Sequence, residues 1–212
     1  MQKGMNAQPK LWEYAEGRPG NGLKDRVCSY SGYSEMTAQV VHRLEVVKSR
    51  VVIIIGFGDK LQLTETTDRT TNMSCQAFAV SLQSSPLLVK HHGVQHCVEI
   101  ELLPWAAREL FHGAFMEPGE GVIDLVELWG NDVLLLAEQL SELDQWQQRF
   151  SLVDRFLSQR ASEARCVTRS EIKWAWQQLE KSGGCLPIGL SVASEQKRTL
   201  STVGTVPVEP LW

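Results

Sequence analysis

Apolar and polar residues alternate along the first half of the chain in the pattern of short β-strands. Successive side chains of a strand point to opposite faces, so a two-residue period separates an inward face from an outward one. One face of the clearest such strand carries Val94, His96, Val98, Ile100 and Leu102. The other face carries Gln95, Cys97, Glu99 and Glu101, and we expect it to be wet. Together with a β-branched run at 51–57 and alternating segments at 61–63 and 77–82, this predicts a small β-barrel or sandwich.

A helical period replaces the two-residue period after residue 103. Pro104 opens a short helix, because the N–H that proline lacks has no partner in a first turn. Further along, apolar residues recur at helical spacing: Val133, Leu136, Ala137, Leu140 and Leu143. Such a stripe usually packs into the core of its own chain, and any exposed part would form a dimer interface. We expect a homodimer whose candidate contact residues are Val133, Leu136, Leu140 and Leu143.

A second helical unit is predicted from residue 166. Thr168 and Glu171 have the spacing of a capping box, and Gly183-Gly184 ends the helix. One stripe of this helix comprises Ile172, Ala175, Trp176 and Leu179. A helix-turn-helix unit opens in this way, but it needs a glycine four residues after a buried alanine. Lys197 occupies that position after Ala193, so the DNA-binding motif is incomplete and periodicity alone favours a plain helical hairpin.

The two ends of the chain show neither the two-residue period of a strand nor the period of a helix. Residues 1–26 are polar and rich in Gly, Pro and Asn, which indicates a mobile or draped arm. Residues 196–212 contain Pro207 and Pro210, which favour an extended, disordered tail. The pattern therefore predicts an α+β fold with a β domain at 27–115, a helical segment at 116–165 and a hairpin at 166–195.

Composition narrows the class of protein. The chain has 212 residues, 43% hydrophobic and 22% charged, with a net charge of −4, so a chain-wide basic surface for nucleic acid is absent. The first ten residues have no apolar signal region, and the run 51–55 is too short to span a membrane. Five cysteines without a Cys-x-x-Cys spacing support neither a disulfide framework nor a zinc ribbon. We expect a cytoplasmic protein that does not contact membranes.

The sequence contains few of the residue patterns that catalysis or metal binding requires. His92 and His96 share a strand face but are four residues apart, roughly 13 Å at about 3.3 Å per residue, whereas zinc–nitrogen bonds are about 2 Å long. The chain has no Gly-x-Ser-x-Gly and no Gly-rich phosphate loop. We expect no catalytic residue, no metal and no cofactor. The candidate lining of a ligand pocket is the inward-facing set Phe78, His96, Val98 and Ile100, with Trp105 at its exit.

Several stretches together resemble the AraC/XylS family of bacterial transcription regulators, in the subgroup with a cupin-like N-terminal domain. The matching stretches are 30–33, 52–58, 92–93, 103–111, 128–130, 148–157, 172–176, 186–188 and 192–193, in family order over about residues 27–195. The resemblance implies ligand sensing in the β domain, dimerisation through 116–165 and a small-molecule effector. It also implies DNA as the partner of full-length members.

The chain departs from the family after Glu195. The family continues with a glycine turn and a recognition helix, whereas the tail here has neither, as a truncation or frameshift would give. Direct major-groove readout then has no element to carry it. The sequence is thus expected to be the sensing and dimerising part of a regulator. The alternatives are a stand-alone sensor or inhibitory heterodimer partner without DNA binding, and a metal-dependent cupin-type enzyme.

Overall fold

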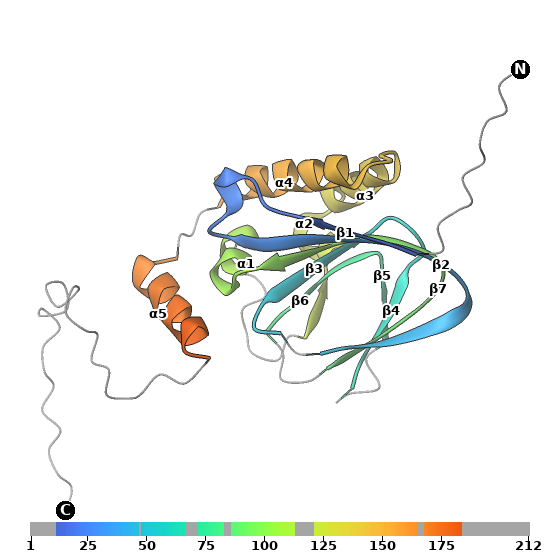
Figure 1. Ribbon diagram of the computed structural model, residues 1–212, viewed down its shortest axis with the longest axis horizontal. Helices are drawn as coiled ribbons and strands as arrows, with labels where there is room; N and C mark the ends of the chain where they lie inside the picture. Colours follow the sequence, from blue (N-terminus) through green and yellow to red (C-terminus); the bar gives the residue numbers. More distant parts are fainter. Residues whose placement is uncertain are drawn as a thin grey trace, which may run out of the picture. The chain divides into compact units, whose positions relative to one another are not determined.

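The structure, a computed structural model, describes residues 12–46, 48–66, 72–82, 86–112, 121–164 and 168–183 (Figure 1). The chain divides into two compact units, Met1–Thr168 and Arg169–Trp212. The strands are β1 Trp12–Gly17, β2 Val27–Glu45, β3 Val51–Gly56, β4 Leu61–Glu65, β5 Asn72–Cys75, β6 Ala77–Val80, β7 Leu87–Leu102 and β8 Val122–Asp124. The helices are a 3-10 turn at Asn21–Leu23, then α1 Pro104–Leu110, α2 Leu125–Trp129, α3 Asp132–Ser141, α4 Trp146–Ser162 and α5 Ser170–Lys181.

Two long strands build the β domain. β2 has 19 residues and β7 has 16, and the two pair antiparallel over most of their length. Their pairing is interrupted between Thr37 and Val41 on β2, opposite Gly93 on β7, which has a φ of 79°. Only glycine adopts that conformation at no steric cost. Figure 1 shows both strands curving back at this point, so each strand contributes to two layers.

The two layers differ in size and share β2 and β7. On one side of the bend the strand order is β1-β2-β7-β3-β6-β8. On the other side, β4 pairs with the first half of β7 and with β5. The turn after β3 holds the bend, because Asp59 donates its N–H to the Val94 carbonyl at 2.8 Å and accepts the Val94 N–H on its carboxylate at 2.9 Å.

Helices cover the outer face of the larger layer. α3 contacts β3, and α4 contacts β1 and α1. Fully buried side chains meet between them, including Ile53, Ile55, Val98, Ile100, Val133, Leu140, Val153 and Leu157. The fold class predicted from the sequence is therefore confirmed: α+β, with a small β-sandwich followed by a helical segment.

Two expectations about the ends of the β domain are wrong. Trp12–Gly17, assigned by its composition to a mobile arm, is a strand that pairs with β2 from Glu35 to Tyr30. Val122–Asp124, assigned to a helix, is a strand paired with β6, and Asp124 then caps α2 by accepting the Val126 N–H at 2.8 Å. Both segments depend on a strand that is distant in sequence.

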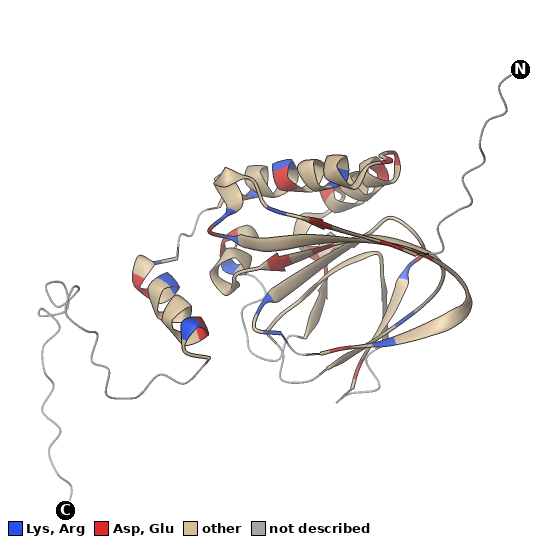
Figure 2. Cartoon of the chain, in the orientation of Figure 1, with Lys and Arg blue, Asp and Glu red and all other residues tan. Residues whose placement is uncertain are grey.

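The second unit is described only as far as residue 183. Its helix α5 begins at Ser170 with Arg169 as N-cap, so the capping box expected at Thr168 does not form. None of its residues is buried. Figure 2 shows that α4 and α5 each carry acidic and basic residues together. The rest of the expected hairpin and the tail lie outside the described residues.

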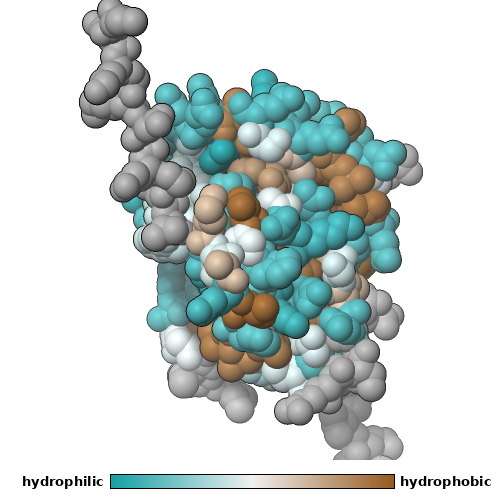
Figure 3. Space-filling model, turned by 90° about the vertical axis from the view of Figure 1, so that its right-hand side faces the viewer, coloured by the Kyte–Doolittle hydropathy of each residue, from teal (hydrophilic) through white to brown (hydrophobic). Residues whose placement is uncertain are grey.

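The surface beside the bend carries both hydrophobic and hydrophilic residues. Figure 3, seen from that side, shows separate hydrophobic patches among hydrophilic atoms. β2 leaves Met36, Val40 and Leu44 between 47% and 58% exposed. No helix among the described residues is long and apolar enough to cross a membrane.

We expect Gly58→Ala to destabilise the β domain. A Cβ at position 58 would collide with the Val94 carbonyl oxygen and lie 2.8 Å from the His96 nitrogen, and backbone atoms cannot swing away. The free energy of unfolding should fall by about 1–3 kcal/mol, measured by urea denaturation. Gly22→Ala is the matched control, because a Cβ there meets nothing within 4 Å. Equal effects of the two substitutions would show that the bend tolerates displacement.

Candidate ligand-binding cavity

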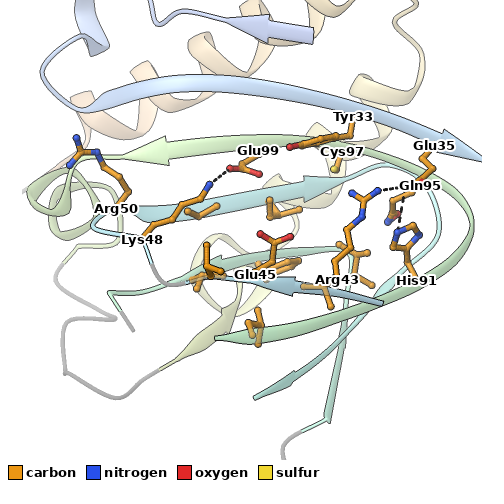
Figure 4. A pocket seen from close by; sticks show the side chains of 18 of the residues that line it. Tyr33, Glu35, Arg43, Glu45, Lys48, Arg50, His91, Gln95, Cys97 and Glu99 are labelled. Carbon is orange, nitrogen blue, oxygen red and sulfur yellow. Dashed lines mark hydrogen bonds and ion pairs between the residues drawn. The ribbon is translucent and has the colours of Figure 1, made fainter. Parts of the chain in front are cut away.

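A cavity of about 110 Å³ lies between the two layers of the sandwich (Figure 4). Its apolar part is formed from both layers by Val52, Ile54, Leu61, Phe78, Leu87 and Val89. Several of these side chains also belong to one buried hydrophobic cluster with Leu63 and Cys75. A concave, mostly apolar space with a few polar groups is the usual form of a small-molecule site.

The polar wall of the cavity is the face of β7 that the alternation pattern assigned to solvent. Gln95, Cys97 and Glu99 all line the cavity, and Gln95 and Cys97 are 5% and 8% exposed. The opposite face of β7, with Val98 and Ile100, packs under the helices. The expectation of a wet face is therefore wrong for Gln95 and Cys97, because the second layer covers them, whereas the Glu101 side chain remains 28% exposed.

Four polar side chains gather at the bend end of the cavity, shown at the right of Figure 4. Arg43 donates to Glu35 across the bend of β2, with 2.5 Å between Nη2 and Oε2. His91 Nε2 lies 3.6 Å from the same carboxylate oxygen. Gln95 Nε2 donates to the Asp59 carbonyl at 3.0 Å. This end therefore combines one ion pair with an imidazole and an amide.

His91 is held neutral near pH 7. Its burial lowers the imidazole pKa below the ordinary value, and this outweighs the opposing effect of Glu35. Arg43 and His92 lower the pKa further. A neutral imidazole offers one N–H donor and one nitrogen acceptor.

A second polar group lies at the opposite end. Lys48 Nζ donates to Glu99 Oε1 and Glu101 Oε1, both at 2.8 Å. Burial alone would lower the Lys48 pKa, but the two carboxylates raise it above its ordinary value. The ammonium therefore stays charged and neutralises part of the acidic lining.

The lining contains a thiol and a phenol, which are nucleophiles when ionised, but both are protonated near pH 7. Burial raises the pKa of the Cys97 thiol to about 12, with Glu99 acting in the same direction. Burial also raises the pKa of the Tyr33 phenol to about 12. A thiol needs to ionise to attack, so the raised pKa disfavours Cys97 as a nucleophile.

The structure separates the five predicted pocket residues. Phe78 lines the cavity. His96 stacks on Phe57, with ring centroids 5.6 Å apart, and its pKa is lowered by burial and then by Arg149. Val98 and Ile100 face the helices, and Trp105 donates its indole N–H to the Asp25 carbonyl at 2.7 Å. These four residues are not in the cavity lining.

Sequence reasoning missed most of the polar lining. Glu35, Arg43, His91 and Gln95 come together at one end because β2 and β7 bend, and Lys48 lines the other end. One signal was available: on the face expected to be wet, Cys97 lies between two glutamine or glutamate neighbours, an unusual residue for a solvated strand.

The predicted dimer residues are in the core of their own chain. Val133, Leu136 and Leu140 are between 0% and 3% exposed, and Leu143 is half-buried. The first three side chains are therefore not available to a partner, and the assignment of a dimer contact to them is wrong. The exposed leucine of α3 is Leu135, at 54%.

Within the described part of the chain, no group of three or more His, Cys, Asp or Glu side chains could hold a metal ion. Of the two histidines weighed from the sequence as metal ligands, His92 is exposed and His96 stacks on Phe57, and neither lines the cavity.

Comparison with known proteins gives structural likenesses of low sequence identity. No family model matches the chain, and no curated protein matches it. ToxT K231A from Vibrio cholerae is similar at 14% identity and a TM-score of 0.44, over 78% of this chain and 66% of ToxT. A second ToxT structure is 11% identical with a TM-score of 0.40, over 82% and 66%. An RmlC-like cupin protein from Desulfovibrio desulfuricans is 7% identical with a TM-score of 0.32, over 49% and 98%.

As the pH is lowered below about 6.5, the ordinary histidine pKa, the free energy of unfolding should decrease. The unfolded chain takes up a proton there, whereas native His91 resists it because its pKa is lowered. His91→Gln should therefore lose less stability than the wild type between pH 7 and pH 5, measured by urea denaturation at each pH. His42→Gln, at an exposed histidine, is the control and should follow the wild type. A His91 variant with the wild-type slope would contradict a neutral buried imidazole.

Leu140→Ala should behave as a core substitution. We expect the free energy of unfolding to fall by about 2–5 kcal/mol, because Leu140 is fully buried within its own chain. Leu135→Ala, at an exposed position of the same helix, should change it little. Light scattering after size exclusion should give the same oligomeric state for Leu140→Ala as for the wild type. Dissociation of a dimer by Leu140→Ala without loss of stability would restore the dimer assignment.

Proposed function

We propose that this chain is the effector-sensing and dimerising part of a transcription regulator of the AraC/XylS type, and that its cavity binds a small amphipathic molecule. The observation that carries the proposal is the cavity itself, which has an apolar middle and polar groups at each end. The sequence resemblance to the family supports the same assignment. The protonated state of Cys97 and Tyr33 favours binding over catalysis.

The position of the cavity suits a sensor. β7 alternates between side chains that line the cavity, such as Cys97, and side chains under the helices, such as Val98. A ligand that displaces β7 therefore also changes how side chains such as Val98 pack on the helical side of the sheet. In a two-state protein, such a ligand shifts the equilibrium by its difference in affinity for the two states.

A buried carboxylate links the end of β7 to the end of the first unit. Glu109 of α1, the helix that directly follows β7, is fully buried. Its carboxylate accepts from Arg26 Nε at 2.9 Å and from the Thr168 N–H at 3.0 Å. Thr168 is the last residue of the first unit. In the proposal, movement of β7 reaches the second unit by way of α1 and this contact.

A screen of small amphipathic molecules by thermal shift tests the proposal. A ligand present at about 100 times its Kd should stabilise the chain by about 2.7 kcal/mol. Val89→Phe, which fills the cavity, should abolish the shift. Val40→Phe makes the same change at a position that is 49% exposed and should preserve it. A ligand shift that survives Val89→Phe would place binding elsewhere.

Hydrogen exchange read by mass spectrometry separates a regulator from a stand-alone sensor. With ligand bound, we expect altered protection in α1 and at Thr168. A ligand that binds in the cavity but leaves both unchanged would favour a sensor that does not act through the second unit.

A further inference from the structure

The bend end of the cavity holds buried polar atoms that have no hydrogen-bond partner among the described residues. The side chain of His91 is 3% exposed, and neither of its ring nitrogens has a partner. Gln95 is 5% exposed, and its Oε1 also has none. Both residues line the cavity (Figure 4). Nearly all buried polar atoms in native proteins are paired, so three such atoms at one place indicate a missing partner.

The orientation of the Gln95 amide is fixed by the turn that holds the bend. Its Nε2 donates to the Asp59 carbonyl at 3.0 Å, and a flipped amide would place two carbonyl oxygens against each other. The Asp59 carboxylate is in turn held by the Val94 N–H at 2.9 Å. Gln95 Oε1 is therefore a positioned acceptor that needs a donor.

The charges at this end are already matched. Glu35 is paired with Arg43 at 2.5 Å, and His91 Nε2, at 3.6 Å from the same oxygen, is too far away to hydrogen bond with it. His91 is neutral, so it offers one donor and one acceptor. The groups that await a partner are therefore uncharged, and they include both donors and acceptors.

We propose that the bend end of the cavity is a subsite for an uncharged group that both donates and accepts, such as the hydroxyl of an aliphatic alcohol. The inference rests on the proposed function, since it names the chemistry of the ligand for the same cavity. The hydroxyl donates to Gln95 Oε1 and accepts from the His91 N–H, while the apolar body of the ligand contacts Ile54, Phe78 and Val89. Because the orphaned atoms are closed off from water, a small side-chain rotation accompanies binding.

Charged head groups fit this end less well. A carboxylate has no proton to give and would face the acceptor Gln95 Oε1 and the carboxylate of Glu35. An ammonium has no acceptor for the His91 N–H and would lose its hydration next to a carboxylate already held by Arg43. An ether can accept but cannot donate, so it leaves Gln95 Oε1 unpaired.

Four six-carbon probes of similar length test the subsite: 1-hexanol, its isomer methyl pentyl ether, hexanoate and hexylamine. Dissociation constants for the whole chain at pH 7.5 are measured by ligand-observed NMR titration. We expect 1-hexanol to bind at least tenfold more tightly than the ether and more tightly than either charged probe. His91→Phe keeps the ring but removes both nitrogens and should abolish the preference for the alcohol. His96→Phe makes the same change outside the cavity and should retain it.

Val89→Phe distinguishes the failure of the subsite from the failure of the cavity. Suppose that Val89→Phe blocks binding, but the wild type shows no preference for 1-hexanol or His91→Phe retains that preference. Either result overturns the subsite and leaves the proposed function standing. If Val89→Phe blocks the binding of none of the four probes, the subsite and the ligand-binding role of the cavity are both overturned. The four-probe comparison needs only the wild-type chain, so it decides the matter even where a variant does not fold.

Discussion

The shared bend of β2 and β7 is the constraint on which the rest of the molecule depends. Two strands of 19 and 16 residues would otherwise form one flat ribbon, with one face of each exposed. Gly93, at a φ of 79°, and the Asp59 turn fold that ribbon over, so that its two halves face each other. The cavity is the space that this fold encloses. The polar residues at its end are those that flank the bend.

The two faces of β7 have different surroundings, the helices on one side and the cavity on the other. In the half of β7 that follows the bend, Val98 and Ile100 are buried on the helical side, whereas Gln95, Cys97 and Glu99 line the cavity. The charged residues on the cavity side are accommodated in pairs, Glu35 with Arg43 and Lys48 with Glu99. The Arg43 and Lys48 side chains remain 40% and 35% exposed, so solvent screens both pairs and each contributes less than a fully buried pair would.

The sequence predicted the elements better than the site. The strand at 51–57 and the helix that carries the leucine stripe were predicted correctly, because local periodicity distinguishes a strand from a helix. Periodicity does not say what covers each face, so the wall containing Gln95 and Glu99 was taken for a solvated surface. His91 and Gln95 are brought together by a bend whose only local signal is a single glycine. The strand at Trp12–Gly17 depends on pairing with β2, which no local pattern of the arm reveals.

The contact between Glu109 and Thr168 has a consequence for how the chain can diverge. Glu109 binds the backbone N–H of position 168 and not its side chain. Every residue except proline supplies that N–H. The contact itself therefore excludes only proline at position 168, although the buried Thr168 hydroxyl limits the size of any replacement. An acid on a helix far away in the sequence thus constrains the backbone at the end of the first unit.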